Sequence, residues 1–150
     1  QVHEARAGRA TSAEAETRTR AALAQAPLNA AHWARLAYLD REMSATMGPK
    51  ALDALDRSYA VAPHGPDITA WRLRFAFEHW PELTPTLREQ AMDEMRVLAR
   101  HRPGAARELA RTIQASGGRM AARMTLSIGQ GEARIAREAK IRDAESKASG

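Results

Sequence analysis

The chain has 150 residues with a formal net charge of +5, and its 44% hydrophobic and 27% charged content indicates one soluble domain. No apolar run approaches the roughly 18 residues of a membrane-spanning helix, and the absence of cysteine excludes disulfides, thiolate metal sites and a cysteine nucleophile. Only 5% of the residues are aromatic while alanine is abundant, so we expect helices that pack through small residues and no sheet.

The first helix is predicted over residues 11–26. Residues 1–10 carry no apolar stripe and are expected to be frayed, whereas Thr11 and Glu14 have the spacing of a capping box. Pro27 then ends the helix, because proline lacks the backbone donor that would continue it.

Two further helices are predicted on either side of a turn over residues 44–49. Asn29 is expected to be the N-cap of the second helix, which extends to Met43. Pro49 suits the first position of the third helix, which ends before Pro63. The apolar residues with helical spacing are Trp33, Leu36, Ala37 and Met43 in the second helix and Leu52, Leu55 and Tyr59 in the third.

The fourth helix is expected to start at Asp67 as its N-cap and to end at Trp80, just before Pro81. Its large apolar residues lie on one side; they are Ile68, Trp71 and Phe75. The fifth helix is predicted to begin near Pro85 and to close at Pro103.

The pattern changes after the sixth helix, which is predicted over residues 105–115. The double glycine Gly117 and Gly118 is expected to stop that helix. Residues 132–150 hold few strongly apolar side chains, so we expect this tail to be a solvated helix or disordered.

One spacing recurs three times along the chain: an Ala, a residue four positions later, another three later, and a Pro five later. The copies are Ala15, Thr19, Ala22 and Pro27; Ala51, Leu55, Ser58 and Pro63; and Ala91, Met95, Leu98 and Pro103. The three prolines are 36 and 40 residues apart, an interval that indicates a stack of helical hairpins. Such stacks usually bind partners and seldom catalyse reactions.

The residues around this spacing resemble a tetratricopeptide repeat. Trp33, Leu36 and Ala37 match the aromatic, large and small positions of the first helix of such a unit, and the copy that ends at Pro63 matches the second helix. Small residues let the two helices of a hairpin approach closely, while large residues fill the space between neighbouring hairpins.

This resemblance implies an all-α fold, in which antiparallel helical hairpins stack as a short α-solenoid. It covers residues 11–116 and leaves residues 117–150 as a basic C-terminal extension. The match is degenerate: the turns are longer than usual, and Arg74 and Phe75 stand where a small residue is expected after Trp71.

The resemblance also implies a binding groove, because the first helix of each unit lines the concave surface in this family. The candidate groove residues are Tyr38, Arg41, Arg72, His79 and Trp80. The alternative is that Trp80 packs beneath the Pro81 turn and that the arginines are solvated. The Asn and Lys clamp that some relatives use on acidic peptide tails is not recognisable, so we expect a protein partner without assigning that ligand class.

A looser resemblance lies in residues 57–88, RSYAVAPHGPDITAWRLRFAFEHWPELTPTLR. This segment is similar to short repeat proteins found beside bacterial envelope-polysaccharide biosynthesis genes. The similarity implies an accessory or scaffold protein of polysaccharide synthesis or export in the cell envelope, periplasmic or membrane-associated; the alternative is a cytoplasmic protein. The chain begins at Gln1 and not at Met, so we expect a removed upstream segment, and a membrane contact only through such a segment.

No catalytic, metal or cofactor site is predicted. The histidines at positions 32, 64, 79 and 101 form no pair at the three- or four-residue spacing of helical metal ligands. Gly129 and Gly131 lack the third glycine and the preceding strand of a phosphate-binding turn, so we expect a flexible joint there. The spacing of the carboxylates builds no acid/base pair.

The positive charge is concentrated in the last third of the chain. Residues 1–100 contain 13 basic and 13 acidic side chains, whereas residues 101–150 contain 10 basic and 5 acidic ones. The basic candidates in the tail are Arg119, Arg123, Arg134, Arg137, Lys140 and Arg142. A second hypothesis is therefore a polyanion-binding protein, for nucleic acid, anionic lipid or acidic polysaccharide, and its alternative is a solvated helical tail. Aromatic residues are absent from residues 101–150, which disfavours single-stranded nucleic acid.

Overall fold

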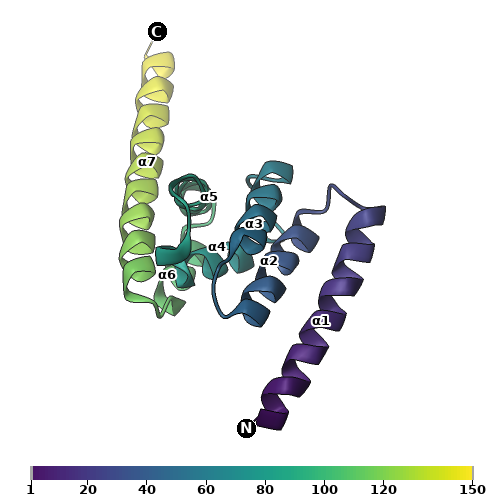
Figure 1. The fold of residues 1–150 in the computed structure, drawn as a ribbon. Helices are drawn as coiled ribbons and strands as arrows, with labels where there is room; N and C mark the ends of the chain where they lie inside the picture. Colours follow the sequence, from purple (N-terminus) through teal and green to yellow (C-terminus); the bar gives the residue numbers. More distant parts are fainter. Residues whose placement is uncertain (1, 150) are drawn as a thin grey trace.

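The computed structural model describes the backbone of residues 2–149 and the side chains of residues 8–149, and all regular structure in this range is helical (Figure 1). The elements are α1 Val2–Gln25, α2 Ala30–Ser44, α3 Pro49–Val61, α4 Thr69–Glu78, the 3-10 helix η1 Trp80–Glu82, α5 Pro85–His101, α6 Pro103–Thr112 and α7 Ser116–Ala148. The predicted all-α fold is confirmed.

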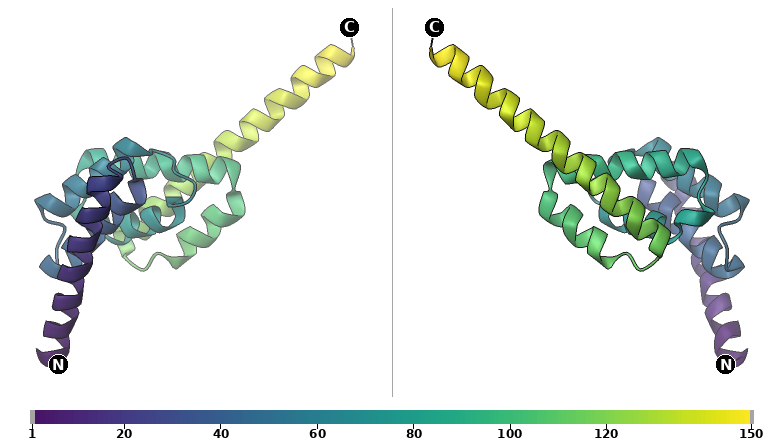
Figure 2. Two further views of the ribbon diagram at one scale, coloured as in Figure 1. Left: turned by 90° about the vertical axis from the view of Figure 1, so that its right-hand side faces the viewer. Right: turned by 90° about the vertical axis from the view of Figure 1, so that its left-hand side faces the viewer.

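The helices pack side by side along a row, with α1 at one end and α7 at the other (Figure 1). α2 lies between α1 and α3, while α5 packs against α4, α6 and α7 (Figure 1). This arrangement is compatible with a short α-solenoid. Figure 2 shows that the C-terminal half of α7 projects away from the packed helices, whereas α1 lies at the other end of the row.

Small residues bring the helices of each hairpin together. Ala37 of α2 and Ala51 of α3 are 0% exposed, as are Ala76 of α4 and Ala91 of α5. A methyl side chain at such a contact lets two helix axes approach closely, and larger apolar residues fill the remaining space. The larger core residues include Leu36, Leu55, Leu73, Phe77, Leu87 and Met95.

The N-terminal helix starts nine residues earlier than predicted. α1 runs from Val2, so the backbone of residues 2–10 is helical and not frayed, while Gln1 lies outside the described residues. Thr11 is not an N-cap: its hydroxyl donates to the Gly8 carbonyl one turn earlier, inside the helix. The alanine-rich sequence and ion pairs at i,i+4 spacing, such as Arg20 with Glu16, sustain this helix.

The predicted starts of three helices are confirmed. The Asn29 side chain accepts a hydrogen bond from the His32 N–H at 3.1 Å and so caps α2, while Pro49 and Pro85 occupy the first positions of α3 and α5. Asp67 was expected to cap α4 but does not, because the chain turns once more and α4 begins at Thr69.

The two glycine pairs of the C-terminal region neither stop a helix nor form a joint; they are Gly117 with Gly118 and Gly129 with Gly131. α6 already ends at Thr112, and all four lie inside the continuous α7. Gly118 packs against the Phe77 backbone and Gly129 against the Arg96 backbone, so glycine there serves close helix contact. The packed unit therefore extends well past the predicted boundary at residue 116.

The rest of α7 is a solvent-exposed helix. Residues 134–149 are exposed throughout, and Gly150 lies outside the described residues. The outer face of the packed half also carries three exposed apolar side chains, Met120, Met124 and Ile128. None of the described helices combines the length and the apolar composition needed to cross a bilayer.

Candidate functional site

Aromatic side chains gather on one face between α2 and α4. We call the surface formed by Tyr38, Trp71, Phe75 and His79 the aromatic groove. Trp71 stacks on Phe75 with a centroid distance of 5.3 Å and an interplanar angle of 10°. Tyr38 meets Trp71 edge to face at 6.1 Å, and His79 meets Phe75 at 4.9 Å. These contacts hold the rings in fixed orientations.

The rotation of α4 about its own axis decides which of these rings reach solvent. Arg72, Leu73 and Phe77 are 0% exposed, because this side of α4 packs into the core. Trp71 precedes Arg72 by about 100° of helix rotation, so its ring lies outside that contact. The result is 44% exposure for Trp71 and 41% for Tyr38 opposite it.

A hollow of about 340 Å³ lies at the mouth of the aromatic groove. Alanines of α2 form its floor, and Tyr38 and Trp71 border it; the lining residues are Ala31, Ala34, Arg35, Tyr38, Leu39, Asp67, Ile68 and Trp71. The small alanine side chains leave the space open, and the lining is mostly apolar.

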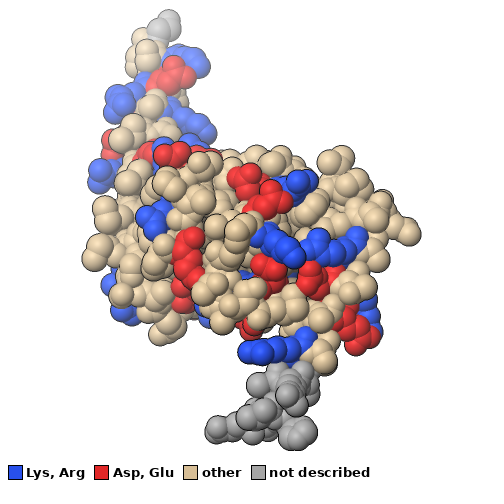
Figure 3. All heavy atoms as spheres, viewed as in Figure 1, with Lys and Arg blue, Asp and Glu red and all other residues tan. Residues whose placement is uncertain are grey.

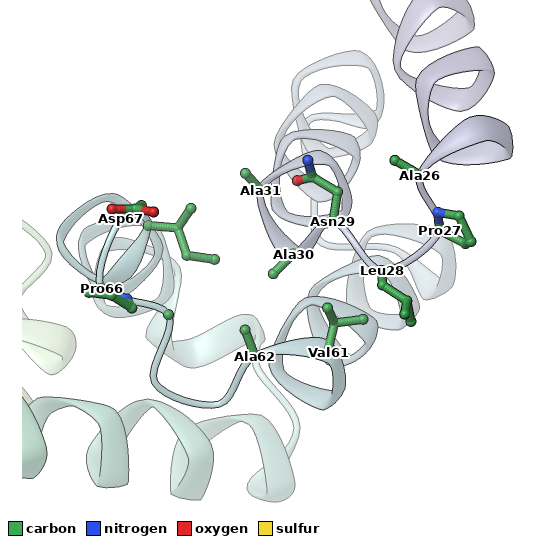
Figure 4. A pocket seen from close by; sticks show the side chains of 12 residues that line it. Ala26, Pro27, Leu28, Asn29, Ala30, Ala31, Val61, Ala62, Pro66 and Asp67 are labelled. Atoms are coloured by element: carbon green, nitrogen blue, oxygen red, sulfur yellow. The ribbon is translucent and has the colours of Figure 1, made fainter.

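This hollow continues into a larger one at the ends of the hairpins. The second hollow, of about 720 Å³, shares Ala31, Asp67 and Ile68 with the first. Figure 4 shows it between the turn before α2, the end of α3 at Val61, and the loop before α4. Leu28 lies at its edge with 81% of its surface exposed. The two hollows therefore adjoin each other; we call them together the apolar channel, and we call the larger one the hairpin-end pocket.

Charged groups close the opposite end of the aromatic groove. The Glu82 carboxylate lies 3.4 Å from Nδ1 of His79 and 3.9 Å from Nη2 of Arg41. The same carboxylate accepts a hydrogen bond from the Met47 N–H at 3.0 Å, which ties η1 to the turn before α3. Burial lowers the pKa of His79 below its ordinary value of 6.5, and the Arg41 charge lowers it further, against the opposing effect of Glu82.

This pKa shift predicts a pH-dependent stability. In the unfolded chain His79 takes up a proton near pH 6.5, but the folded chain resists protonation, so the free energy of unfolding should fall as pH drops below about 6.5. Urea denaturation at pH 7.5 and 5.5 should show a smaller decrease for His79→Gln than for the wild type. His101→Gln, at an exposed histidine, is the control. Equal decreases in all three proteins would refute this role of His79.

The structure brings three of the five predicted groove residues together. Tyr38, Arg41 and His79 lie along the same face, as the contacts above describe. Arg72 and Trp80 do not belong to it. Trp71 is the aromatic residue that the groove prediction omitted, and only the register of α4 distinguishes it from Arg72, because the sequence places tryptophan and arginine next to each other.

Arg72 is a buried structural residue and not an exposed groove residue. Its side chain is 0% exposed and donates to both carboxylate oxygens of Glu94, at 2.6 and 3.1 Å. The guanidinium also donates to the carbonyls of Ser58, Ala62 and Pro63 at 2.8–3.0 Å. Arg72 therefore joins α4 to α5 and to the C-terminal end of α3.

Trp80 lies on the other side of α4. Its ring stacks on Phe77 at 5.1 Å and packs against the core, and the Arg88 guanidinium lies 5.5 Å from its centroid. Arg88 also donates to the Trp80 and Pro81 carbonyls. Trp80 thus packs at the turn at Pro81, as the alternative to the groove prediction has it.

The basic tail residues all lie on α7. Arg119 and Arg123 are on its packed half, while the others are on the projecting half, where Figure 3 shows several basic side chains at the surface. Arg137 and Lys140 border a hollow against α5 and α6.

In the part of the chain with described side chains, no group of three His, Asp or Glu side chains is placed to hold a metal ion. Comparisons with family models, with curated proteins and with solved structures gave no match. The function must therefore be inferred from the surfaces of the molecule itself.

Proposed function

We propose that this protein is a non-enzymatic interaction module whose aromatic groove binds a segment of a partner protein. One observation carries the proposal: Trp71 and Tyr38 stand 44% and 41% exposed at the mouth of an apolar channel, and no described element covers them. Tryptophan and tyrosine are the residues most often found as energetic anchors of protein interfaces.

The shape of the channel favours a short amphipathic helix or turn as the bound segment. The apolar side chains of the bound segment would enter the hairpin-end pocket, whose lining includes Leu28, Val61 and Ile68. Arg35 and Asp67 at the rim offer one charge of each sign for polar partners. Apolar anchors with a polar rim are the usual anatomy of a helix-in-groove interface.

Removal of the two aromatic anchors should abolish this binding. A peptide selected from a displayed library against the wild-type chain should bind the double variant Trp71→Ala/Tyr38→Ala at least about 30-fold more weakly, since anchor residues contribute about 2 kcal/mol or more. Isothermal titration calorimetry measures the loss, and far-UV circular dichroism confirms that the fold is retained.

The matched control removes exposed apolar side chains elsewhere. Met124→Ala/Ile128→Ala changes residues of α7 that are 62% and 53% exposed and lie outside the channel. This control should bind the peptide like the wild type. Peptides that bind the two double variants equally well would overturn the groove as the binding site.

We further propose that the partner belongs to a bacterial cell-envelope assembly for polysaccharide synthesis or export. This part rests on the resemblance of residues 57–88 to accessory repeat proteins of that process. Fractionation of the natural host, with an antibody against this chain, should find the protein in the periplasmic or membrane fraction. Recovery from the cytoplasm alone would overturn it.

A further inference from the structure

A third hollow, of about 570 Å³, lies between the end of α5, the start of α6 and the middle of α7. We call it the cationic hollow. Four of its lining side chains are Arg or Lys, a fifth is His101, and no Asp or Glu lines it; the lining residues are Ala99, Arg100, His101, Pro103, Arg107, Gln130, Ala133, Ala136, Arg137 and Lys140. The cationic hollow is separate from the aromatic groove and shares no residue with it.

Most of these charges are not neutralised within the protein. Arg100 lies 3.8 Å from Glu132, a carboxylate that is also held by Arg96. Within the described residues, Arg107, Arg137 and Lys140 form no ion pair at all. Two helices, α6 and α7, therefore bring unpaired positive charge to one concave surface beside the partly neutralised Arg100 of α5, and a bound anion would interact with several of these side chains at once.

The start of α6 adds to this positive potential. Pro103 lines the cationic hollow and occupies the first position of α6. The N-terminal end of a helix carries a partial positive charge and backbone N–H groups without intrahelical partners. Gly104 beside it leaves the backbone open, since no atom lies within 4 Å of the position that a Cβ would take.

We propose that the cationic hollow binds a compact anion that carries two adjacent phosphate groups. Two phosphate groups bring about three to four negative charges, which matches the three unpaired cations and the partly neutralised Arg100. Arginine suits phosphate because its planar guanidinium donates two parallel hydrogen bonds. The volume of about 570 Å³ fits a small ligand.

Two extended polyanions fit these observations less well. Single-stranded nucleic acid binds through aromatic rings that stack on its bases, and the cationic hollow contains no Phe, Tyr or Trp. An acidic polysaccharide spreads its charges along a chain, whereas the four Arg and Lys side chains of the hollow line a single space of about 570 Å³. We therefore expect a small diphosphate group, free or as the headgroup of a lipid.

Titration of the full chain with inorganic pyrophosphate at low ionic strength tests the proposal. Calorimetry should show saturable binding, at least about tenfold tighter than for inorganic phosphate, because a second phosphate adds charged hydrogen bonds. The double variant Arg107→Gln/Lys140→Gln should lose at least about tenfold in affinity for pyrophosphate. Both side chains are exposed, so the fold should tolerate the change.

The control variant Arg119→Gln/Arg123→Gln removes the same charge from α7 outside the cationic hollow. It should retain pyrophosphate affinity within about twofold. Equal losses in the two variants would show a general effect of net charge and overturn the site, as would the absence of pyrophosphate binding. Tighter binding of heparin or of a DNA oligonucleotide, unaffected by Arg107→Gln/Lys140→Gln, would also overturn it.

Vesicles distinguish the two sources of the diphosphate. Phosphatidylcholine vesicles that contain a long-chain prenyl diphosphate present a diphosphate as a lipid headgroup. If the wild type binds both pyrophosphate and these vesicles, and Arg107→Gln/Lys140→Gln binds neither, the proposal holds with a lipid headgroup as ligand. Binding of pyrophosphate alone supports a free diphosphate compound, and binding of vesicles without pyrophosphate would overturn the proposal.

Discussion

Replacement of Arg72 by alanine is expected to lower the free energy of unfolding by about 3–5 kcal/mol. Arg72 and Glu94 are 0% and 1% exposed at their side chains, and their nitrogen and oxygen atoms approach to 2.6 Å. Removal of the guanidinium leaves the Glu94 carboxylate buried without its counter-ion and the Ala62 and Pro63 carbonyls without their donor. Because domains are stable by only about 5–15 kcal/mol, the loss is large.

Two companion variants test the physical cause of this loss. Arg72→Met/Glu94→Leu removes both charges and should recover a large part of the stability, since two apolar side chains carry no unpaired charge. Arg74→Ala, two residues away on the exposed side of α4, should change the free energy by less than about 0.5 kcal/mol. Guanidinium denaturation followed by tryptophan fluorescence measures all three. A double variant less stable than Arg72→Ala would contradict the buried-charge explanation.

Gly118→Ala is the second variant with a large expected effect. A Cβ at this position would lie 1.7 Å from the Phe77 carbonyl oxygen and 2.6 Å from its carbon. These are backbone atoms of α4, so α7 must move away from α4 to accept the methyl group. We expect a loss of about 3 kcal/mol or more in the free energy of unfolding, at the upper end of overpacking effects. Thermal and denaturant unfolding both report it.

Other glycines of the same helix supply matched comparisons. Gly129→Ala should also destabilise, because its Cβ would lie 2.7 Å from the Ala99 Cβ and 3.0 Å from the Arg96 carbonyl oxygen. Gly131→Ala has no atom within 4 Å and should stabilise the protein by about 0.5–1 kcal/mol through the better helix propensity of alanine. If Gly118→Ala and Gly131→Ala had the same effect, the close approach of α7 to α4 would be wrong.

Some features of the fold were predictable from local sequence. Asn29, Pro49 and Pro85 act at helix starts through interactions with neighbours along the chain, so their positions alone specify the boundary. The position of Asp67 looks equivalent in the sequence, but residues 66–68 form a turn in which the Ile68 and Thr69 N–H groups donate to the Gly65 carbonyl, and Asp67 is not the N-cap.

The glycines show where a local rule fails. In a sequence, Gly117 and Gly118 indicate a helix end because glycine weakens an isolated helix. In the molecule, the same lack of a side chain lets α7 pass close to α4 at Gly118 and to α5 at Gly129. The packing that results stabilises α7 across positions that would break a solvated helix.

For the candidate sites, too, local sequence predicts some features and helix packing decides others. The prolines, the alanine spacing and the basic last third of the chain were sufficient to determine an all-helical row of hairpins with a positive C-terminal region, because helix ends, helix faces and net charge are local or additive properties. Which of Trp71 and Arg72 reaches solvent, and which basic side chains surround the cationic hollow, was decided only by tertiary structure. Both depend on the rotation and spacing of helices that are far apart in the sequence, and packing against neighbouring helices sets these quantities.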